Sequence, residues 1–238
     1  MKELDGFTLA EVLITLGIIG VVAALTLPAV INNIMHKELE TGLKEGYSIL
    51  QQGLARMSAD LGVTVTSNEY SVGDGDPGNF YKDYVKYFNI LYDCGVSNPD
   101  PSICMSRASN INEDTDFYND LSYKTFNGNK VFSNVFDDGQ FVLQNGMLVM
   151  IENPNQASNS NIFISIDVNG KKKRPNKLGY DVFSFKLMSD GKLLPMGMKE
   201  TDYNNENTYC SKTSTSNVNG IGCASKALSD PNYFKNLP

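Results

Sequence analysis

The longest apolar stretch of the chain lies near its start, between Val12 and Ile31. No charged residue interrupts these positions. A helix needs about 20 apolar residues to cross the hydrocarbon core of a bilayer. The stretch therefore predicts a membrane-spanning helix, and Pro28 should kink it or melt it locally near Ala24.

Beyond Ile31 the apolar residues recur at steps of three and four, which is typical of an amphipathic helix. Charged and amide side chains fill much of the remainder. We expect residues 32–62 to continue the helix into water and to bury this stripe against the rest of the chain. The apolar positions are Ile34, Met35, Leu39, Leu43, Tyr47, Leu50, Leu54, Met57 and Leu61.

Residues 63–238 are predicted to form an α+β head, in which an antiparallel sheet packs on the long helix. Asn145-Gly146 separates two apolar runs, and Asn-Gly supplies the positive φ angles of a tight hairpin turn. Further strand-like runs follow. The expected elements are a short helix at 79–91, irregular surface from Cys94 to about Asn119, strands at 140–144, 147–151, 161–168 and 181–187, and a turn at Asp190-Gly191 before Leu193-Leu194.

Four cysteines fall in two close pairs, Cys94 with Cys104 and Cys210 with Cys223. Three disulfide connectivities are open, and proximity favours the sequential one. Closing loops of this size would stabilise the fold by about 3 kcal/mol each in the chain-entropy model. Zinc sites favour cysteines spaced by two to four residues, often with histidine, so disulfides fit better. They place the head in an oxidising compartment.

The charge balance is acidic, with a formal net charge of -7. This argues against a phosphate-binding surface as the main role. The basic block from Lys171 to Arg174 follows Asn169-Gly170 and is interpreted as a solvated hairpin tip rather than a nucleic-acid site. No phosphate loop, nucleophile elbow or zinc-protease motif is present, and the single histidine, His36, cannot supply a triad. We do not predict an enzyme.

The one acid beside the apolar stretch is Glu11. A carboxylate costs about 2.5–3.5 kcal/mol in the middle of a bilayer, so it calls for a partner. The stretch holds no lysine or arginine, so that partner must come from a chain terminus or from another molecule. The alternative is local, because Thr8 and Glu11 have the spacing of a capping box that closes the start of a helix.

The segment Gly6-Phe7-Thr8-Leu9-Ala10-Glu11, followed by an apolar run, resembles the processing site of type IV prepilins and of the pseudopilins of type II secretion systems. The resemblance implies that residues 1–6 are a leader peptide, cut after Gly6 by a prepilin peptidase that also N-methylates Phe7. It makes residues 7–31 a filament-core helix, Glu11 the assembly residue and Pro28 the family proline. The leader departs from the family because its basic character is weak: it has one lysine, Lys2, and two acids, Glu3 and Asp5.

The resemblance implies a pilin-like structural subunit of a type IV pilus or a secretion pseudopilus. Its partners would be copies of itself, other pilins or pseudopilins, and an inner-membrane assembly platform. The subunit would cross the cytoplasmic membrane once, with its head outside, before it enters the filament. Two alternatives remain: a membrane-tethered binding module that never polymerises, and a DNA-uptake minor pilin, against which the acidic balance counts.

A calcium site in the head is a further possibility. Asp167, Asn169 and Asp181 gather oxygen ligands in one predicted loop, and major pseudopilins often hold calcium in a late loop of the head. The spacing does not match an EF-hand. Turn chemistry, in which such side chains bond nearby backbone groups, is the favoured interpretation. No other cofactor is expected.

Overall fold

The computed structural model describes residues 8–70, 79–96, 100, 102–105, 122–153 and 161–237. Contacts divide the chain into two units, Met1–Glu38 and Leu39–Pro238, and we call the second the head unit. The boundary falls inside α1 (Leu9–Leu61), within the stretch predicted to be amphipathic. The chain is therefore α+β, with a long apolar N-terminal helix.

α1 confirms the predicted long helix, and Pro28 lies inside it. The backbone is helical on both sides of this proline, so the local melting expected near Ala24 is not seen. Because proline has no backbone N–H, only one hydrogen bond of the helix is lost, and the bonds of the neighbouring turns keep the backbone helical.

Most of the predicted apolar stripe is buried on the face of α1 that packs in the head unit. Three glycines, Gly42, Gly46 and Gly53, lie on the same face and let the sheet approach the helix axis. The ends of the predicted stripe are different, because Ile34 and Leu61 are about half exposed. The buried apolar residues of the stripe are Leu39, Leu43, Leu50, Leu54 and Met57.

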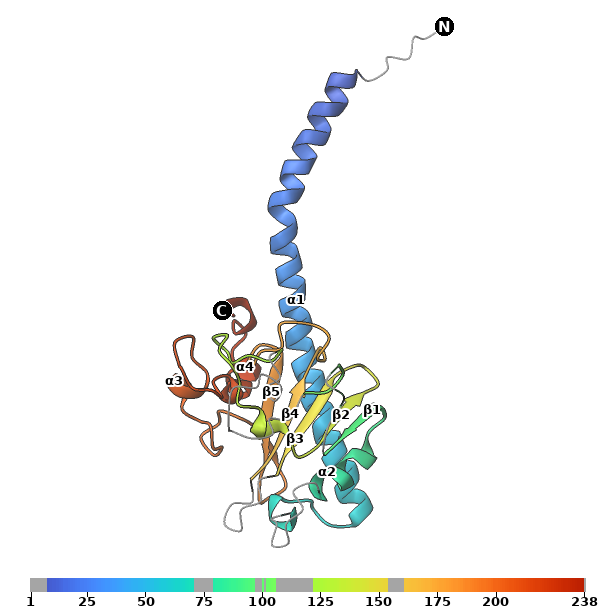
Figure 1. Cartoon of the computed structure of the whole chain (residues 1–238), viewed down its shortest axis with the longest axis vertical. Helices are drawn as coiled ribbons and strands as arrows, with labels where there is room; N and C mark the ends of the chain where they lie inside the picture. The colour runs from blue at the N-terminus through green and yellow to red at the C-terminus, as the bar shows by residue number, and fades with distance from the viewer. Residues whose placement is uncertain are drawn as a thin grey trace. The chain divides into compact units, whose positions relative to one another are not determined.

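The described residues of the head unit form one antiparallel sheet of six strands, which pair in chain order as a meander (Figure 1). The hairpin at Asn145-Gly146 and the second predicted strand pair are confirmed. The strands are β1 (Ile90–Gly95), β2 (Gln140–Leu143), β3 (Leu148–Glu152), β4 (Ile162–Asp167), β5 (Val182–Leu187) and β6 (Leu193–Pro195).

The helix expected at 79–91 is shorter than predicted. α2 (Asn79–Tyr84) and a 3-10 turn end at Tyr87, and the chain then becomes the edge strand β1. Pairing with β2 wins over local helical preference, because backbone bonds such as Gln144 N–H to the Asn89 carbonyl fix the extended form.

Both faces of the sheet are buried. One face meets α1, where Tyr47 stacks on Phe185 with ring centroids 4.7 Å apart. The opposite face meets a second apolar cluster that contains Cys94, Cys104 and Tyr123. The two cysteines are thus core residues, and the prediction that they lie in irregular surface was wrong for them.

The free edge of β6 is capped. The register with β5 turns the backbone groups of Leu193 and Pro195 outward. Tyr47 Oη donates to the Leu193 carbonyl at 2.7 Å, and Met198 N–H donates to the Pro195 carbonyl at 3.3 Å. Pro195 has no N–H to offer.

Short helices complete the head unit, and disulfides tie two of its loops. The bonds join Cys94 to Cys104 and Cys210 to Cys223, as proximity favoured. We call residues 206–236 the C-terminal lobe. The remaining short elements are η1 (Ser67–Tyr70), η2 (Val85–Tyr87), η3 (Ser133–Phe136), α3 (Glu206–Tyr209), η4 (Ile221–Cys223), α4 (Ala224–Ser229) and η5 (Phe234–Asn236).

Candidate functional site

The start of α1 carries a complete capping box. Thr8 N–H and Thr8 Oγ1 both donate to Glu11 Oε2, each at 2.8 Å. Glu11 N–H reaches back to Thr8 Oγ1 at 3.3 Å. One carboxylate oxygen thus closes the free backbone N–H of the first turn, while Oε1 has no partner among the described residues.

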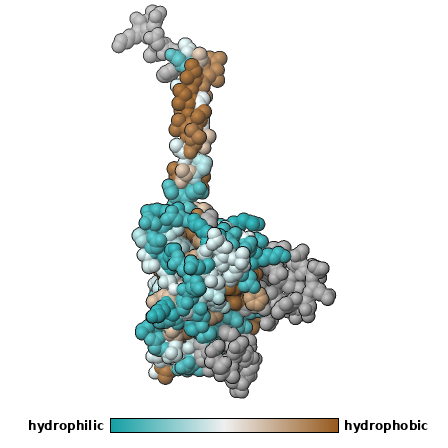
Figure 2. Space-filling model, turned by 90° about the vertical axis from the view of Figure 1, so that its left-hand side faces the viewer, coloured by the Kyte–Doolittle hydropathy of each residue, from teal (hydrophilic) through white to brown (hydrophobic). Residues whose placement is uncertain are grey.

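The surface around this cap is apolar. Between Thr8 and Ile34 every side chain is exposed except that of Ala23, which is half-buried. Figure 2 shows one side of this segment covered by apolar side chains. By length and composition, α1 can cross a membrane. An isolated helix that is apolar all round needs lipid or other helices to cover it.

The other sequence-predicted residues of this region are only partly described. Gly6 and Phe7, the predicted processing site, lie outside the described residues. The same segment of α1 also contains Gly17 and Gly20, and apart from the helix's own nearby backbone no atom lies within 4 Å of where their Cβ atoms would be. These positions leave flat surface at which another helix could approach closely.

The predicted calcium residues do come together at the β4–β5 loop. Asp167 ends β4 and Asp181 precedes β5, and both side chains are buried. Burial first, and then the charge of Asp181, raises the pKa of Asp167 well above its usual range. Burial also raises the pKa of Asp181, to about 6. Two adjacent buried carboxylates need protons or donors to neutralise them.

Protein donors already occupy the four carboxylate oxygens of this pair. Asp181 accepts from the backbone N–H groups of Asn176 and Lys177 at 2.8 and 2.6 Å, and the Asn169 side chain also donates to it. A calcium ligand would present the Asn169 oxygen, not its NH₂ group. The described arrangement fits turn chemistry. Asp167 accepts from Tyr123 Oη at 2.7 Å, Gly170 N–H at 2.9 Å and Asn169 N–H at 3.3 Å.

A second acidic cluster is formed only by the fold. Asp137 and Asp138 directly precede Gly139, and Glu152 at the end of β3 lies beside them, with oxygens within 4.8 Å of one another. Burial and the charges of the two aspartates raise the pKa of Glu152 to about 9. Its Oε2 atom is buried without a partner among the described residues. Glu152 is therefore a neutral carboxylic acid near pH 7.

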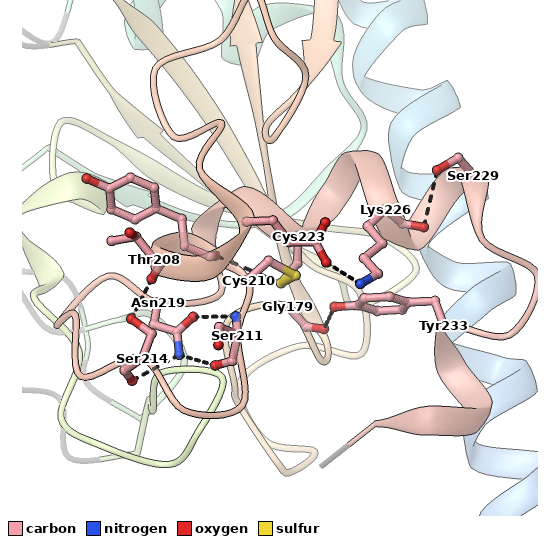
Figure 3. The surroundings of a disulfide bond; sticks show 12 residues. Gly179, Thr208, Cys210, Ser211, Ser214, Asn219, Cys223, Lys226, Ser229 and Tyr233 are labelled. Atoms are coloured by element: carbon pink, nitrogen blue, oxygen red, sulfur yellow. Dashed lines mark hydrogen bonds and ion pairs between the residues drawn. A yellow bond between two sulfur atoms is a disulfide. The ribbon is translucent and has the colours of Figure 1, made fainter.

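Hydrogen bonds and a disulfide fix the C-terminal lobe in one shape (Figure 3). Asn219 is fully buried and bridges the lobe's loop, accepting from Ser211 N–H at 3.0 Å and donating to the Ser211 carbonyl at 2.7 Å. Tyr233 Oη donates to the Gly179 carbonyl, which ties the lobe to the β4–β5 loop. Figure 3 shows these bonds on both sides of the Cys210–Cys223 bridge.

A cavity of about 320 Å³ lies beside this disulfide. Ion-paired Glu206 and Lys226 and the rim residue Lys212 give it a mixed charge, while Phe126 and Tyr233 form its apolar part. Both rings are buried. The volume is at the lower end of the range for small-molecule sites, about 300–1,000 Å³.

No protein-family model, curated protein or solved structure matches this chain.

Proposed function

We propose that this protein is a structural subunit of a filament of the type IV pilus or type II secretion pseudopilus kind. It is cut after Gly6, N-methylated at Phe7, held in the cytoplasmic membrane with its head outside, and polymerised through α1. The observation that carries the proposal is the unpartnered apolar surface from Leu9 to Ile34, with one carboxylate, Glu11, at its start.

The cost of exposing this apolar surface to water favours a direct transfer of the helix from lipid to a filament core. Leaving a Leu or Ile side chain in water instead of burying it costs about 1.5–3 kcal/mol. A subunit leaving the bilayer therefore needs another apolar environment for the same helix. Helices of neighbouring subunits supply it in a filament core, so burial is conserved when lipid is exchanged for protein.

Glu11 sets how neighbouring subunits are aligned along the filament axis. After the cut, the new N-terminus is the amine of Phe7 on each subunit. A carboxylate paired with the amine of a neighbour is neutralised only in the assembled state, and only at one axial stagger. Such a pair must outweigh the desolvation of both ions, which demands close geometry.

The decisive experiment compares Glu11→Ala with Thr8→Val in the natural host. Thr8→Val removes the hydroxyl of the capping box and leaves the carboxylate, so it controls for weakening of the helix start. We expect both variants to be processed and to fold. Filament entry should be lost in Glu11→Ala and retained in Thr8→Val, measured by shearing filaments from cells and immunoblotting them.

Equal loss in the two variants would mean that Glu11 acts only as a cap, and unchanged assembly in Glu11→Ala would refute the role proposed for it. Processing is checked separately by intact-mass analysis of the mature chain. The expected N-terminus is methylated Phe7, and its formation should require a prepilin peptidase.

A second candidate function is a membrane-tethered binding module that does not polymerise. Two observations favour it: the capping box already gives Glu11 a partner within its own chain, and the C-terminal lobe holds a cavity. Under this function, Glu11→Ala leaves activity untouched, whereas filling the cavity, for example with Asn207→Trp, abolishes it.

A further inference from the structure

Three lysines, two from one hairpin and one from the β4–β5 loop, lie in a row on the head unit. Lys124 pairs with Lys130 across an antiparallel bridge and with Lys177 across a parallel one. Residues directly opposite one another in such bridges place their side chains on the same face, about 4.5–5.5 Å apart at Cβ. Like charges in these positions destabilise the fold, so the row favours an anionic partner.

The basic block beside this row adds exposed charge. Lys172, Lys173 and Arg174 are exposed and have no ion pair with any residue that the structure describes. Lys171 is different, because its Nζ donates to the Cys104 carbonyl at 2.6 Å. We define the basic patch as Lys124, Lys130, Lys172, Lys173, Arg174 and Lys177.

Among the residues that the structure describes, Asp100 and Asp181 act on the basic patch, and neither forms a side-chain ion pair with it. The charges of Lys171 and Lys172 help to lower the pKa of Asp100, but hydrogen bonds from Ser102 are the larger cause. Asp181 is buried, and its charge raises the pKa of Lys177 less than burial lowers it. The patch is thus a local concentration of positive charge on a chain whose net charge is -7.

The place of the basic patch in the head unit indicates what it meets. Val168 begins the loop that carries the block, and its Cβ lies 3.2 Å from where a Cβ on Gly42 would be. Gly42 is eleven residues after Ile31, the last residue of the uncharged stretch. Gly42 is also close to Leu39, the first residue of the head unit. The loop therefore lies beside the start of the head unit's part of α1.

We infer that the basic patch binds the headgroups of anionic phospholipids while the subunit is in the membrane. This rests on the membrane span of the proposed function. Polybasic surfaces next to a spanning helix are attracted by anionic leaflets, with about 1 kcal/mol for each Lys or Arg near the surface. The contact would hold the head against the bilayer until assembly removes the subunit.

A nucleic acid is the competing anion, and the charge distribution disfavours it. A duplex presents one negative charge for about every 1.7 Å, so a bound duplex runs past a small patch and meets the surrounding surface. That surface is acidic overall, since the chain is at -7 with the patch included. Lipid headgroups can gather at the patch alone.

The test is lysine acetylation footprinting of the full-length protein in lipid nanodiscs, read by peptide mass spectrometry. One set of discs is pure phosphatidylcholine, and the other is an equimolar mixture with phosphatidylglycerol. We expect Lys124, Lys130, Lys172 and Lys173 to react about fivefold more slowly in the anionic discs. About 1 M NaCl, where the Debye length is about 3 Å, should remove the difference.

Lys192 is the internal control, because its turn lies beside Thr64, just past the C-terminal end of α1 and far along the chain from Gly42. The double variant Lys172→Glu, Lys173→Glu should restore fast labelling of Lys124 and Lys130, and Lys192→Glu should not. Equal rates in the two kinds of disc would overturn the inference and leave the proposed function standing. A chain that fails to enter discs would contradict the membrane span itself. Protection by duplex DNA but not by phosphatidylglycerol would reassign the patch to nucleic acid.

Discussion

The three buried glycines of α1 allow a graded test of how the long helix packs on the sheet. Replacing each by alanine adds one methyl group at positions that differ in available space. On Gly42 the new Cβ would lie 3.2 Å from Val168 Cβ; on Gly46, 2.8 Å from Ile166 Cδ1. On Gly53 it would lie 2.1 Å from a ring carbon of Phe88.

Two opposing effects set the magnitude of each substitution. Alanine in a helix interior gains about 1 kcal/mol over glycine, and overpacking costs about 1–3 kcal/mol. Gly42→Ala should therefore be nearly neutral, and Gly46→Ala slightly destabilising, because the Ile166 methyl can rotate away. Gly53→Ala should lose about 2 kcal/mol. The Phe88 ring cannot retreat easily, since it packs on Tyr84 and Phe141 with centroids 4.7 and 5.1 Å away.

Urea unfolding of the full-length protein in detergent, followed by near-ultraviolet circular dichroism, measures these differences. The chain has no tryptophan, so its tyrosines carry the signal. The double variant Gly53→Ala, Phe88→Leu should recover part of the lost stability, since the smaller side chain makes room. If Gly53→Ala is as stable as Gly42→Ala, the helix does not approach the sheet as described and the reasoning fails.

Two further predictions concern the buried acids. Glu152 keeps its proton in the folded state up to about pH 9, whereas its ordinary pKa is 4.5, so stability should fall as pH rises between these values, by up to about 1.4 kcal/mol per pH unit. Glu152→Gln should flatten that slope in pH-dependent unfolding; an unchanged slope would assign it to other groups. For the Asp167–Asp181 pair, we expect isothermal titration with calcium to give no heat and calcium to leave the melting temperature unchanged. A melting temperature raised by calcium and not by magnesium would contradict the turn interpretation.

Local patterns were sufficient to predict much of this fold. The extent of α1 follows from apolar residues at helical spacing, and the hairpin at Asn145-Gly146 follows from turn chemistry between two apolar runs. The capping box was also visible, because Thr8 and Glu11 are one helical turn apart and need no tertiary partner. Interactions between residues a few positions apart can be predicted from the sequence alone, because they need no tertiary contact.

Features that depend on distant residues were missed. β1 was not predicted, because nothing in the local sequence indicates its pairing with β2: its first two residues fell in the expected helix and Cys94 in expected irregular surface. Glu152 reads as the polar end of a strand until the fold brings Asp137 and Asp138 beside it. In the same way Lys171–Arg174 resembled an ordinary solvated turn, because Lys124 and Lys130, which belong to the same basic patch, lie more than forty positions away along the chain.

The capped edge of β6 affects how head units interact when many of them lie close together. Heads held close together, as on the membrane of the proposed function, would collide often, and an open edge strand would let their sheets join as continuous ribbons. The Leu193 carbonyl already accepts from Tyr47, and Pro195 has no amide hydrogen, so this edge offers few free hydrogen-bonding groups to a strand of another molecule. Contacts between heads through the β6 edge should therefore be short-lived. Other surfaces of the subunit then determine which subunits bind each other.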